Sequence, residues 1–329
     1  MKLSILDQAP ISSNQTPAVA LQESVKLAKA GEDLGFTRYW IAEHHDLAGL
    51  ACSAPEVMLG YIGAHTKSIR IGSGAVLLPH YKPYKVAELY NTLATLFPNR
   101  IDIGIGRAPG GSAEVTNALS DNFLQNVFNM PTSVVELLQF INGTFPKGHK
   151  YSTVRAAPVP ETPPEAWLLG TSKKSAELAA ENGMFYAFGL FMSDNDGKEI
   201  IELYRKNFVS SKQEANVILT VSVICSETNQ KAEEIALSSL VWKVLTDKGE
   251  GRNGVPSAEE AKSYPLTQIE KGKINNMKDR MIVGNPVSVK EQLLALQKDY
   301  NCDEIMVVTI THDANDRLES YRLLSRELL

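Results

Sequence analysis

The sequence predicts a single (β/α)8 barrel, an α/β TIM barrel, spanning residues 1–329 with surface insertions near 108–165 and 247–279. Short apolar runs alternate with longer amphipathic stretches along nearly the whole chain, which is typical of parallel strands joined by right-handed helical crossovers. Barrels of this kind often exceed about 250 residues as one domain. An open doubly wound sheet is the competing fold, but no GxGxxG motif opens a helix after the first strand.

The first part of the chain contains four apolar runs, each followed by a longer stretch. Leu3–Leu6 is predicted to be a strand, and Pro17–Leu34 a helix, because its apolar residues fall largely on one helical face and Gly35 closes it. The elements predicted next are a strand at Arg38–Ala42, a helix from Pro55, a strand at Ile69–Gly72, a helix at Pro83–Leu96 and a strand at Ile101–Ile105.

The second part begins with a less regular segment, 108–165, in which one helix is expected at Ser133–Phe140 and several prolines indicate an extended connection. The polar segment 247–279 is expected to be a surface insertion. Between and after these segments we predict strands at Trp167–Leu169, Met184–Phe188, Asn216–Ile224 and Glu304–Val308, and helices at Ser172–Asn182, Gly197–Phe208, Asn229–Leu245, Pro286–Leu296 and Arg317–Leu328.

Composition narrows the class of protein. The net charge of −5 argues against nucleic acid or an anionic membrane as the main partner, because both require a clustered basic face. The three cysteines are far apart and form no CxxC pair, so neither a disulfide framework nor a structural zinc site is indicated. No secretory signal or long apolar span is evident, and a cytoplasmic location is expected.

Functional groups of such barrels gather at the carboxyl ends of the strands. Glu43, His44 and His45 follow the second strand directly, and neighbours on an extended segment point in opposite directions, so only one histidine should face a pocket. A metal site would need a further ligand at suitable geometry, and none is predicted. A neutral imidazole can donate or accept a proton near pH 7, whereas a purely structural pair of histidines is the alternative.

Two glycine-rich segments also follow strands. Gly74 and Ala75 end the run after the third strand, where glycine lets the backbone approach a flat ligand closely, although a bulge or turn is equally consistent. Arg107 follows the fourth strand among Gly104, Gly106 and Gly110, and its guanidinium suits pairing with an anion. An exposed arginine on a solvated loop is the alternative.

A phosphate site is possible at the next strand end. Gly170, Thr171, Ser172 and Ser175 lie between the fifth strand and its helix, where free N–H groups and hydroxyls can hold a phosphate. Ordinary N-capping by Thr171 or Ser172 is the alternative, and both can occur together. The segment 309–313 after the last strand is a second possible phosphate site, because barrels often use that position.

Taken together these segments resemble the luciferase-like flavin monooxygenase family, which includes bacterial luciferase and alkane monooxygenase. Any one segment would be weak, but their order along nearly the whole chain and their placement at strand ends are specific. The matching segments are Arg38–His45, Ile69–Pro79, Arg100–Gly110, Leu169–Ser172, Ile282–Pro286 and Asp303–Thr309.

The resemblance implies a monooxygenase that takes up reduced FMN, usually supplied by a separate reductase, and reacts it with dioxygen. In relatives the histidine matching His44 acts in the site, and the bond matching Gly74–Ala75 is often a cis peptide beneath the flavin ring. The arginine matching Arg107 lies beside the flavin, so we assign Arg107 to both catalysis and cofactor binding. The loop matching Gly170 to Ser175, which includes Thr171 and Ser172, holds the phosphate.

Three departures from the family pattern stand out. Gly106 replaces the reactive cysteine of the luciferase subunit, so light emission is not implied. Asn99 stands where many relatives have glycine, and Ser120 and Asp121 stand where relatives often carry arginines, which would weaken the anchoring of an anion.

Two other functions fit the same fold: a hydride-transfer enzyme that uses the deazaflavin F420 and needs no oxygen, and a non-catalytic flavin-binding protein. The resemblance also makes a homodimer plausible. We expect the unidentified small-molecule substrate to be recognised by the segments 108–165 and 247–279.

Overall fold

Eight parallel strands close into a barrel in the computed structural model of the chain, which describes residues 1–209 and 213–329. Each strand pairs with the next along the chain, apart from the short β4, and the last strand β10 pairs with both β1 and β8, which completes the ring. This confirms the predicted (β/α)8 barrel. The barrel strands are β1 (Lys2–Asp7), β2 (Arg38–Ile41), β3 (Arg70–Ser73), β5 (Ile101–Gly106), β6 (Glu165–Gly170), β7 (Phe185–Gly189), β8 (Val217–Cys225) and β10 (Glu304–Val308).

Two short strands were not predicted. β4 (Val76–Leu77) pairs with the end of β5, and β9 (Met281–Gly284) pairs with the last four residues of β8. Both extend the sheet at its carboxyl end, so they lengthen the wall on the side where functional groups are expected.

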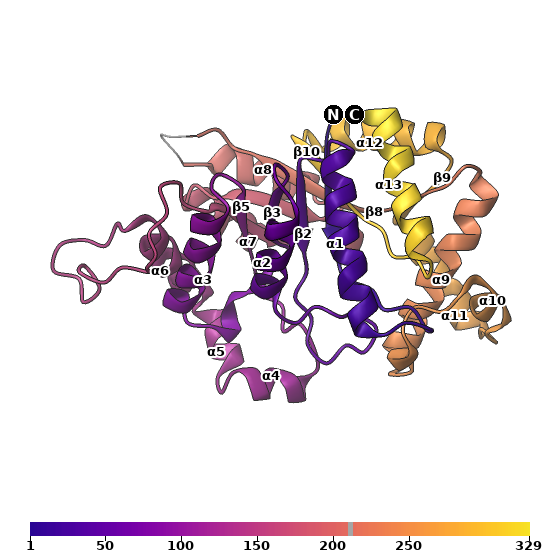
Figure 1. Ribbon diagram of the computed structural model, residues 1–329, viewed down its shortest axis with the longest axis horizontal. Coiled ribbons are helices and arrows are strands. Elements are labelled where there is room, and N and C mark those ends of the chain that lie inside the picture. Colours follow the sequence, from indigo (N-terminus) through magenta and orange to yellow (C-terminus); the bar gives the residue numbers. More distant parts are fainter. Residues whose placement is uncertain (210–212) are drawn as a thin grey trace.

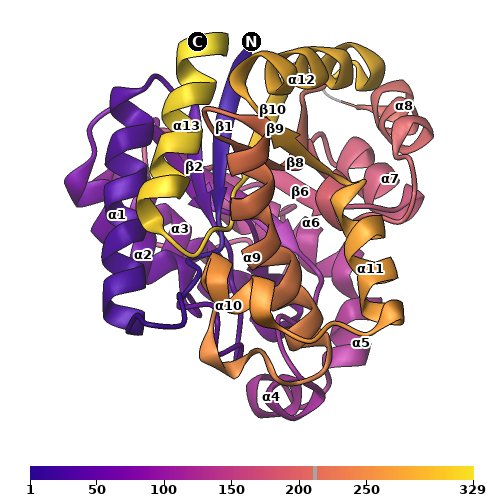
Figure 2. The ribbon, with the colours of Figure 1, turned by 90° about the vertical axis from the view of Figure 1, so that its right-hand side faces the viewer.

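Helices surround the barrel, and the two chain termini lie side by side at one end of it (Figures 1 and 2). Most begin at a polar cap or a proline, as for Thr16 and Pro17 at the start of α1. The helices around the barrel are α1 (Pro17–Asp33), α2 (Pro55–His65), α3 (Pro83–Leu96), α6 (Met130–Asn142), α7 (Lys173–Glu181), α8 (Lys198–Asn207), α9 (Asn229–Asp247), α12 (Pro286–Tyr300) and α13 (Ala314–Leu328).

The two predicted insertions contain more regular structure than expected. The first holds α4 (Ala113–Leu119) and α5 (Phe123–Phe128) before α6, which is longer than the predicted Ser133–Phe140. The second holds α10 (Ala258–Ser263) and α11 (Gln268–Lys278). In Figures 1 and 2 these four added helices gather at the end of the barrel opposite the termini, which is the end where the strands finish.

The barrel interior explains several glycines. Trp40 and Trp167 meet edge to face inside the barrel, with ring centroids 5.5 Å apart. A Cβ atom at Gly72 would stand 2.8 Å from Trp40, and one at Gly104 would stand 2.0 Å from the carbonyl oxygen of Ser73. These two glycines therefore make room for packing inside the barrel.

A buried ionic layer closes the barrel at the amino ends of the strands. Arg38 donates from Nε to Oε1 of Glu304 over 2.9 Å and from Nη1 to Oδ2 of Asp102 over 2.8 Å. All three side chains are at most 5% exposed. The pKa of Arg38 is raised by Asp102 and Glu304 although burial acts in the opposite direction, so the guanidinium stays charged. This layer leaves only the other end of the barrel open for a ligand.

Among the described residues, no helix is long and apolar enough to cross a membrane.

Candidate active site

A cavity of about 480 Å³ opens at the carboxyl end of the barrel. Its floor comes from the ends of β1, β2, β8 and β10 and its far wall from α9 and the segment 277–281. A cavity of this size at this end of a (β/α)8 barrel is the usual place for a reacting small molecule. The lining residues are Gln8, His44, Leu47, Leu50, Phe191, Met192, Ser222, Ser239, Leu240, Trp242, Lys243, Thr246, Met277, Arg280, Met281, Val308 and Ile310.

Of the two adjacent histidines, only His44 lines this cavity, as the alternation of side chains predicts. Its backbone N–H donates to the carbonyl oxygen of Cys52 over 2.9 Å, which fixes the chain just after β2. Its Nδ1 atom is buried and has no hydrogen-bond partner within the described ranges. Burial, and to a lesser extent the nearby His45, lowers the pKa of His44 to about 4. The imidazole is therefore neutral at pH 7.

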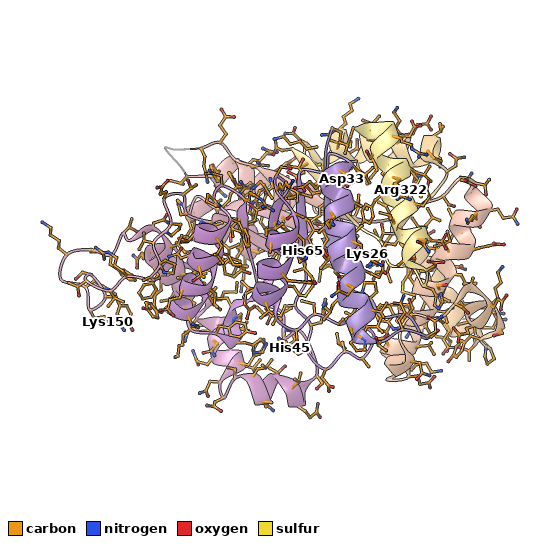
Figure 3. All side chains as sticks on the ribbon, viewed as in Figure 1. Lys26, Asp33, His45, His65, Lys150 and Arg322 are labelled. Atoms are coloured by element: carbon orange, nitrogen blue, oxygen red, sulfur yellow. The ribbon has the colours of Figure 1, made fainter. Side chains whose placement is uncertain are left out.

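His45 points to the other side and belongs to a buried hydrogen-bonded cluster. Its Nε2 lies 2.8 Å from Oε1 of Glu43, and the same oxygen accepts from the Tyr81 hydroxyl over 2.6 Å. The other oxygen of Glu43 accepts from the backbone N–H of Leu77 over 3.0 Å. Figure 3 shows His45 at the strand-end side of the barrel, close to the added helices of the first insertion. The cluster ties the segment carrying His44 to β4 and so holds it in place.

The peptide bond between Gly74 and Ala75 is cis, as the resemblance implies. The N–H of Gly74 donates to the carbonyl oxygen of Ile41 over 2.8 Å, and Ala75 is buried. A Cβ atom at Gly74 would stand 2.6 Å from Leu6, and one at Gly106 would stand 2.9 Å from the Cβ of Ala75. Neither Gly74 nor Ala75 lines the cavity that contains His44.

A second cavity, of about 410 Å³, lies between α5, α6 and α7. Arg107, Lys174 and Ser175 line it together with apolar residues such as Leu124 and Phe128. Arg107 is exposed, and its guanidinium has no hydrogen bond or ion pair with any described residue. No carboxylate lines this cavity among the described residues, so its charge favours an anion.

The start of α7 borders this second cavity and is pre-organised by its own serines. Ser172 is the N-cap: its Oγ accepts from the N–H of Ser175 over 3.3 Å, and Oγ of Ser175 accepts from the N–H of Ser172 over 3.2 Å. Gly170 is needed here because a Cβ atom on it would stand 2.3 Å from that hydroxyl. The first N–H groups of any helix lack intrahelical partners, so those of Lys173 and Lys174 can meet an anion.

The predicted site residues thus fall into two groups. His44 lines the first cavity, whereas Arg107 and Ser175 line the second. Gly170, Thr171 and Ser172 line neither, but they lead directly into the helix start beside Ser175. N-capping by Ser172 and phosphate binding at the start of α7 can occur together, because capping uses the hydroxyl of Ser172 and leaves the first backbone N–H groups of the helix for another partner.

Sequence reasoning missed most of the first cavity's wall. Gln8 directly follows β1 and could have been found by position, whereas Ser222 lies within β8. Trp242 and Arg280 lie outside the strand ends and carry no local signal. Of the two segments expected to recognise the substrate, 108–165 contributes nothing to this cavity among the described residues and 247–279 contributes only Met277.

The family model described as luciferase-like monooxygenase matches residues 1–300. The chain belongs to the luciferase-like monooxygenase family. Within this family it is 43% identical over 329 residues to the uncharacterized protein YceB of Bacillus subtilis, covering 99% of both chains. It is 37% identical to the N-acetyl-S-alkylcysteine monooxygenase of Bacillus subtilis, covering 100% of this chain and 98% of that protein.

Solved structures of luciferase-like monooxygenases and other relatives share the fold. The crystal structure of apo-MsnO8 superposes with a TM-score of 0.89 at 34% identity and covers 99% of this chain and 97% of that one. An FMN complex of the oxygenating constituent of 3,6-diketocamphane monooxygenase from Pseudomonas putida has a TM-score of 0.74 at 18% identity over 100% and 98% of the two chains. An F420-dependent secondary alcohol dehydrogenase has a TM-score of 0.65 at 13% identity over 98% and 97%. The last two show the fold alone.

The structure explains two of the positions at which this chain departs from the family pattern. Asn99 has φ 63°, in the left-handed region that asparagine tolerates better than most residues, so it can stand where relatives have glycine. Gly106 packs against Ala75, where any side chain would meet the Cβ of that alanine.

Proposed function

We propose that this luciferase-like monooxygenase uses reduced FMN, supplied by a separate reductase, and dioxygen to oxygenate a small organic substrate. The observation that carries the proposal is the pairing of two features at one end of the barrel. One is a cavity with a neutral, unpartnered imidazole at His44, and the other is a cation-lined cavity at Arg107. The first suits proton transfer and the second suits the phosphate of a flavin.

The residues present fit FMN. Arg107 is a guanidinium without a carboxylate partner among the described residues, and Lys174 and Ser175 in the first turn of α7 line the same cavity. A phosphate there would give Arg107 the anionic partner that it lacks among the described residues. In this proposal Arg107, Ser175 and the segment from Gly170 to Ser172 hold the phosphate end, and Gly74 and Ala75 support the ring.

Reduced flavin supplies the two electrons by which one atom of dioxygen enters the substrate and the other leaves as water. The protein's own contribution at the reacting centre is His44. Because burial lowers its pKa to about 4, the imidazole is neutral at pH 7, and in this proposal it exchanges a proton with a reacting group in the cavity. The apolar part of the same cavity, including Leu240 and Phe191, excludes water from that exchange.

The test is turnover under ¹⁸O₂ with FMN and a flavin reductase, using N-acetyl-S-benzylcysteine first because a relative acts on N-acetyl-S-alkylcysteines. The expected product carries one ¹⁸O atom. His44→Ala should lose about 10²- to 10⁴-fold in turnover while it still binds FMN, since general acid–base groups contribute about that much. His65→Ala, at an exposed position on α2, is the matched control.

Other outcomes would replace the proposal. If reduced F420 binds and reduced FMN does not, a deazaflavin-dependent hydride transfer is the better account. If FMN is held tightly and a wider panel of thioethers, ketones and aldehydes gives no oxygen consumption above the free-flavin rate, the chain is a flavin-binding protein without turnover. Unchanged product formation in His44→Ala would exclude the role of that residue.

A further inference from the structure

The first cavity is cationic as well as apolar. Lys243 and Arg280 both line it, and among the described lining residues there is no aspartate or glutamate. Most of the remaining wall is apolar, for example Leu240, Phe191 and Val308. A site for a neutral hydrocarbon would gain nothing from two cations, so the wall indicates a ligand with an apolar body and a negative end.

Helix α9 presents one polar stripe to this cavity. Ser239, Trp242, Lys243 and Thr246 are spaced three and four residues apart and all line it. The hydroxyls of Ser239 and Thr246 donate back to carbonyl oxygens of the helix, over 3.0 Å to Ala236 and 2.9 Å to Trp242. The polar group of the stripe that remains for a ligand is therefore the ammonium of Lys243.

The indole N–H is a donor without an acceptor. Trp242 is only 8% exposed, and its Nε1 has no hydrogen-bond partner in the part of the chain that the structure describes. Because that nitrogen is buried, Trp242 contributes its ring to the cavity wall and does not expose the N–H there. The ring is fixed in place because Gly49 lies beneath it: a Cβ atom there would stand 2.5 Å from the indole.

The ion pairs that the two cations form among the described residues are with exposed carboxylates outside the cavity lining. Nη1 of Arg280 lies 2.7 Å from Oδ1 of Asp194, whose side chain is 89% exposed. Nζ of Lys243 lies 3.0 Å from Oδ1 of Asp247, and both of those side chains are well exposed. Exposed ion pairs contribute about 0–1 kcal/mol, so a ligand carboxylate can take the place of either partner at little cost.

We propose that the substrate of this site is an amphiphilic carboxylate, recognised at its negative end by Arg280 and Lys243. The apolar body lies against Leu240 and Phe191. This inference names the substrate class of the proposed monooxygenase, and the ligand is a substrate only if that proposed function is correct. The binding itself can be tested without flavin or oxygen.

The experiment measures the dissociation constants of N-acetyl-S-benzylcysteine and of its primary amide, which has nearly the same shape and no charge. Octanoate and octanamide form a second pair with a different body. Isothermal titration of the full chain at low salt is expected to give tighter binding of each acid than of its amide by about 10- to 100-fold, since hydrogen bonds to charged groups are worth about 1.5–3 kcal/mol. Arg280→Met should abolish most of that preference and leave the amide affinity unchanged.

Further variants separate charge from geometry. Arg280→Lys should retain part of the preference, because it keeps the charge but loses the planar fork. Lys243→Met should also reduce the preference. Arg322→Met, on the exposed face of α13, should match the wild type.

Three results would overturn the inference: equal binding of acid and amide to the wild type, no binding of any acid, or an acid preference that survives Arg280→Met combined with Lys243→Met. Unchanged acid binding in Arg280→Met, together with weakened FMN binding of that variant in a separate flavin titration, would instead assign these cations to the flavin. Because these titrations contain no flavin, their failure is distinguishable from failure of ¹⁸O incorporation.

Discussion

Nη1 of Arg38 lies 2.8 Å from Oδ2 of Asp102, deep inside the amino end of the barrel, and the same guanidinium also bonds Glu304. The side chain of Arg38 on β2 thus links β5 and β10, which are far apart in the sequence. Removing that cation would leave the buried Glu304 without a cationic partner among the described residues, whereas Asp102 would keep its ion pair with Arg70. Leaving a buried charge unpaired is among the costliest changes a protein core can suffer.

Arg38→Met is therefore expected to lower the free energy of unfolding by about 3–5 kcal/mol, the usual cost of breaking a buried pair. Urea unfolding of the variant measures it. Arg322→Met removes an exposed pair with Glu319 and should change stability by less than about 1 kcal/mol. Equal stability of wild type and Arg38→Met would contradict a structural role for the layer.

Gly104→Ala should destabilise the barrel because the new methyl group would meet the backbone of Ser73 at 2.0 Å. Overpacking of this kind costs about 1–3 kcal/mol or more. The matched control is Gly272→Ala in α11, where nothing lies within 4 Å and helix propensity predicts a gain of about 0.5–1 kcal/mol. Thermal unfolding of both variants should move in opposite directions, and parallel shifts would refute the packing explanation.

The lowered pKa of His44 predicts a pH dependence of stability. Between about pH 4 and pH 6.5 the unfolded chain binds a proton at this residue that the folded chain does not, so stability rises with pH across that window and is lost as the pH falls. His44→Gln should flatten this part of the profile, measured by urea unfolding at several pH values. His65→Gln, at an exposed position, should keep the wild-type slope; an identical slope in His44→Gln would disprove the burial effect.

Arg107→Met should weaken binding of FMN by about 10- to 100-fold, because a charge-assisted hydrogen bond contributes about 1.5–3 kcal/mol. Riboflavin, which lacks the phosphate, should bind wild type and variant equally. Flavin fluorescence titration measures both constants, with Arg326→Met on α13 as an exposed control. A parallel loss of riboflavin affinity would place Arg107 away from the phosphate.

The barrel strands could be predicted because each is a short, strongly apolar run between amphipathic stretches. The predicted strand Ile101–Ile105 differs from β5 by a single residue at its end. β9 was missed because its four residues pair only with the end of β8 and follow a helix directly. The helices α10 and α11 were also missed. The S/T-x-x-E capping pattern, which indicates the start of a helix, is present at both, as Ser257 with Glu260 and Thr267 with Glu270.

The site could be predicted only where a residue ends a strand. His44 follows β2 and Arg107 follows β5, so barrel geometry alone places them at the open end. Trp242 and Arg280 line the cavity of His44, but they come from α9 and from the turn after α11. Periodicity shows that a helix has an apolar face, but it does not tell whether that face meets the core or a cavity. Those residues required the tertiary structure.

The most direct test of the central claim is anaerobic titration of the protein with reduced FMN and, in parallel, with reduced F420, followed by admission of dioxygen. The account predicts saturable binding of reduced FMN, weakened in Arg107→Met and preserved in His44→Ala. It also predicts that the bound flavin reoxidises along a different time course from free flavin, and that His44→Ala alters this course. Binding of reduced F420 without binding of reduced FMN would contradict the account and leave the barrel with a different cofactor.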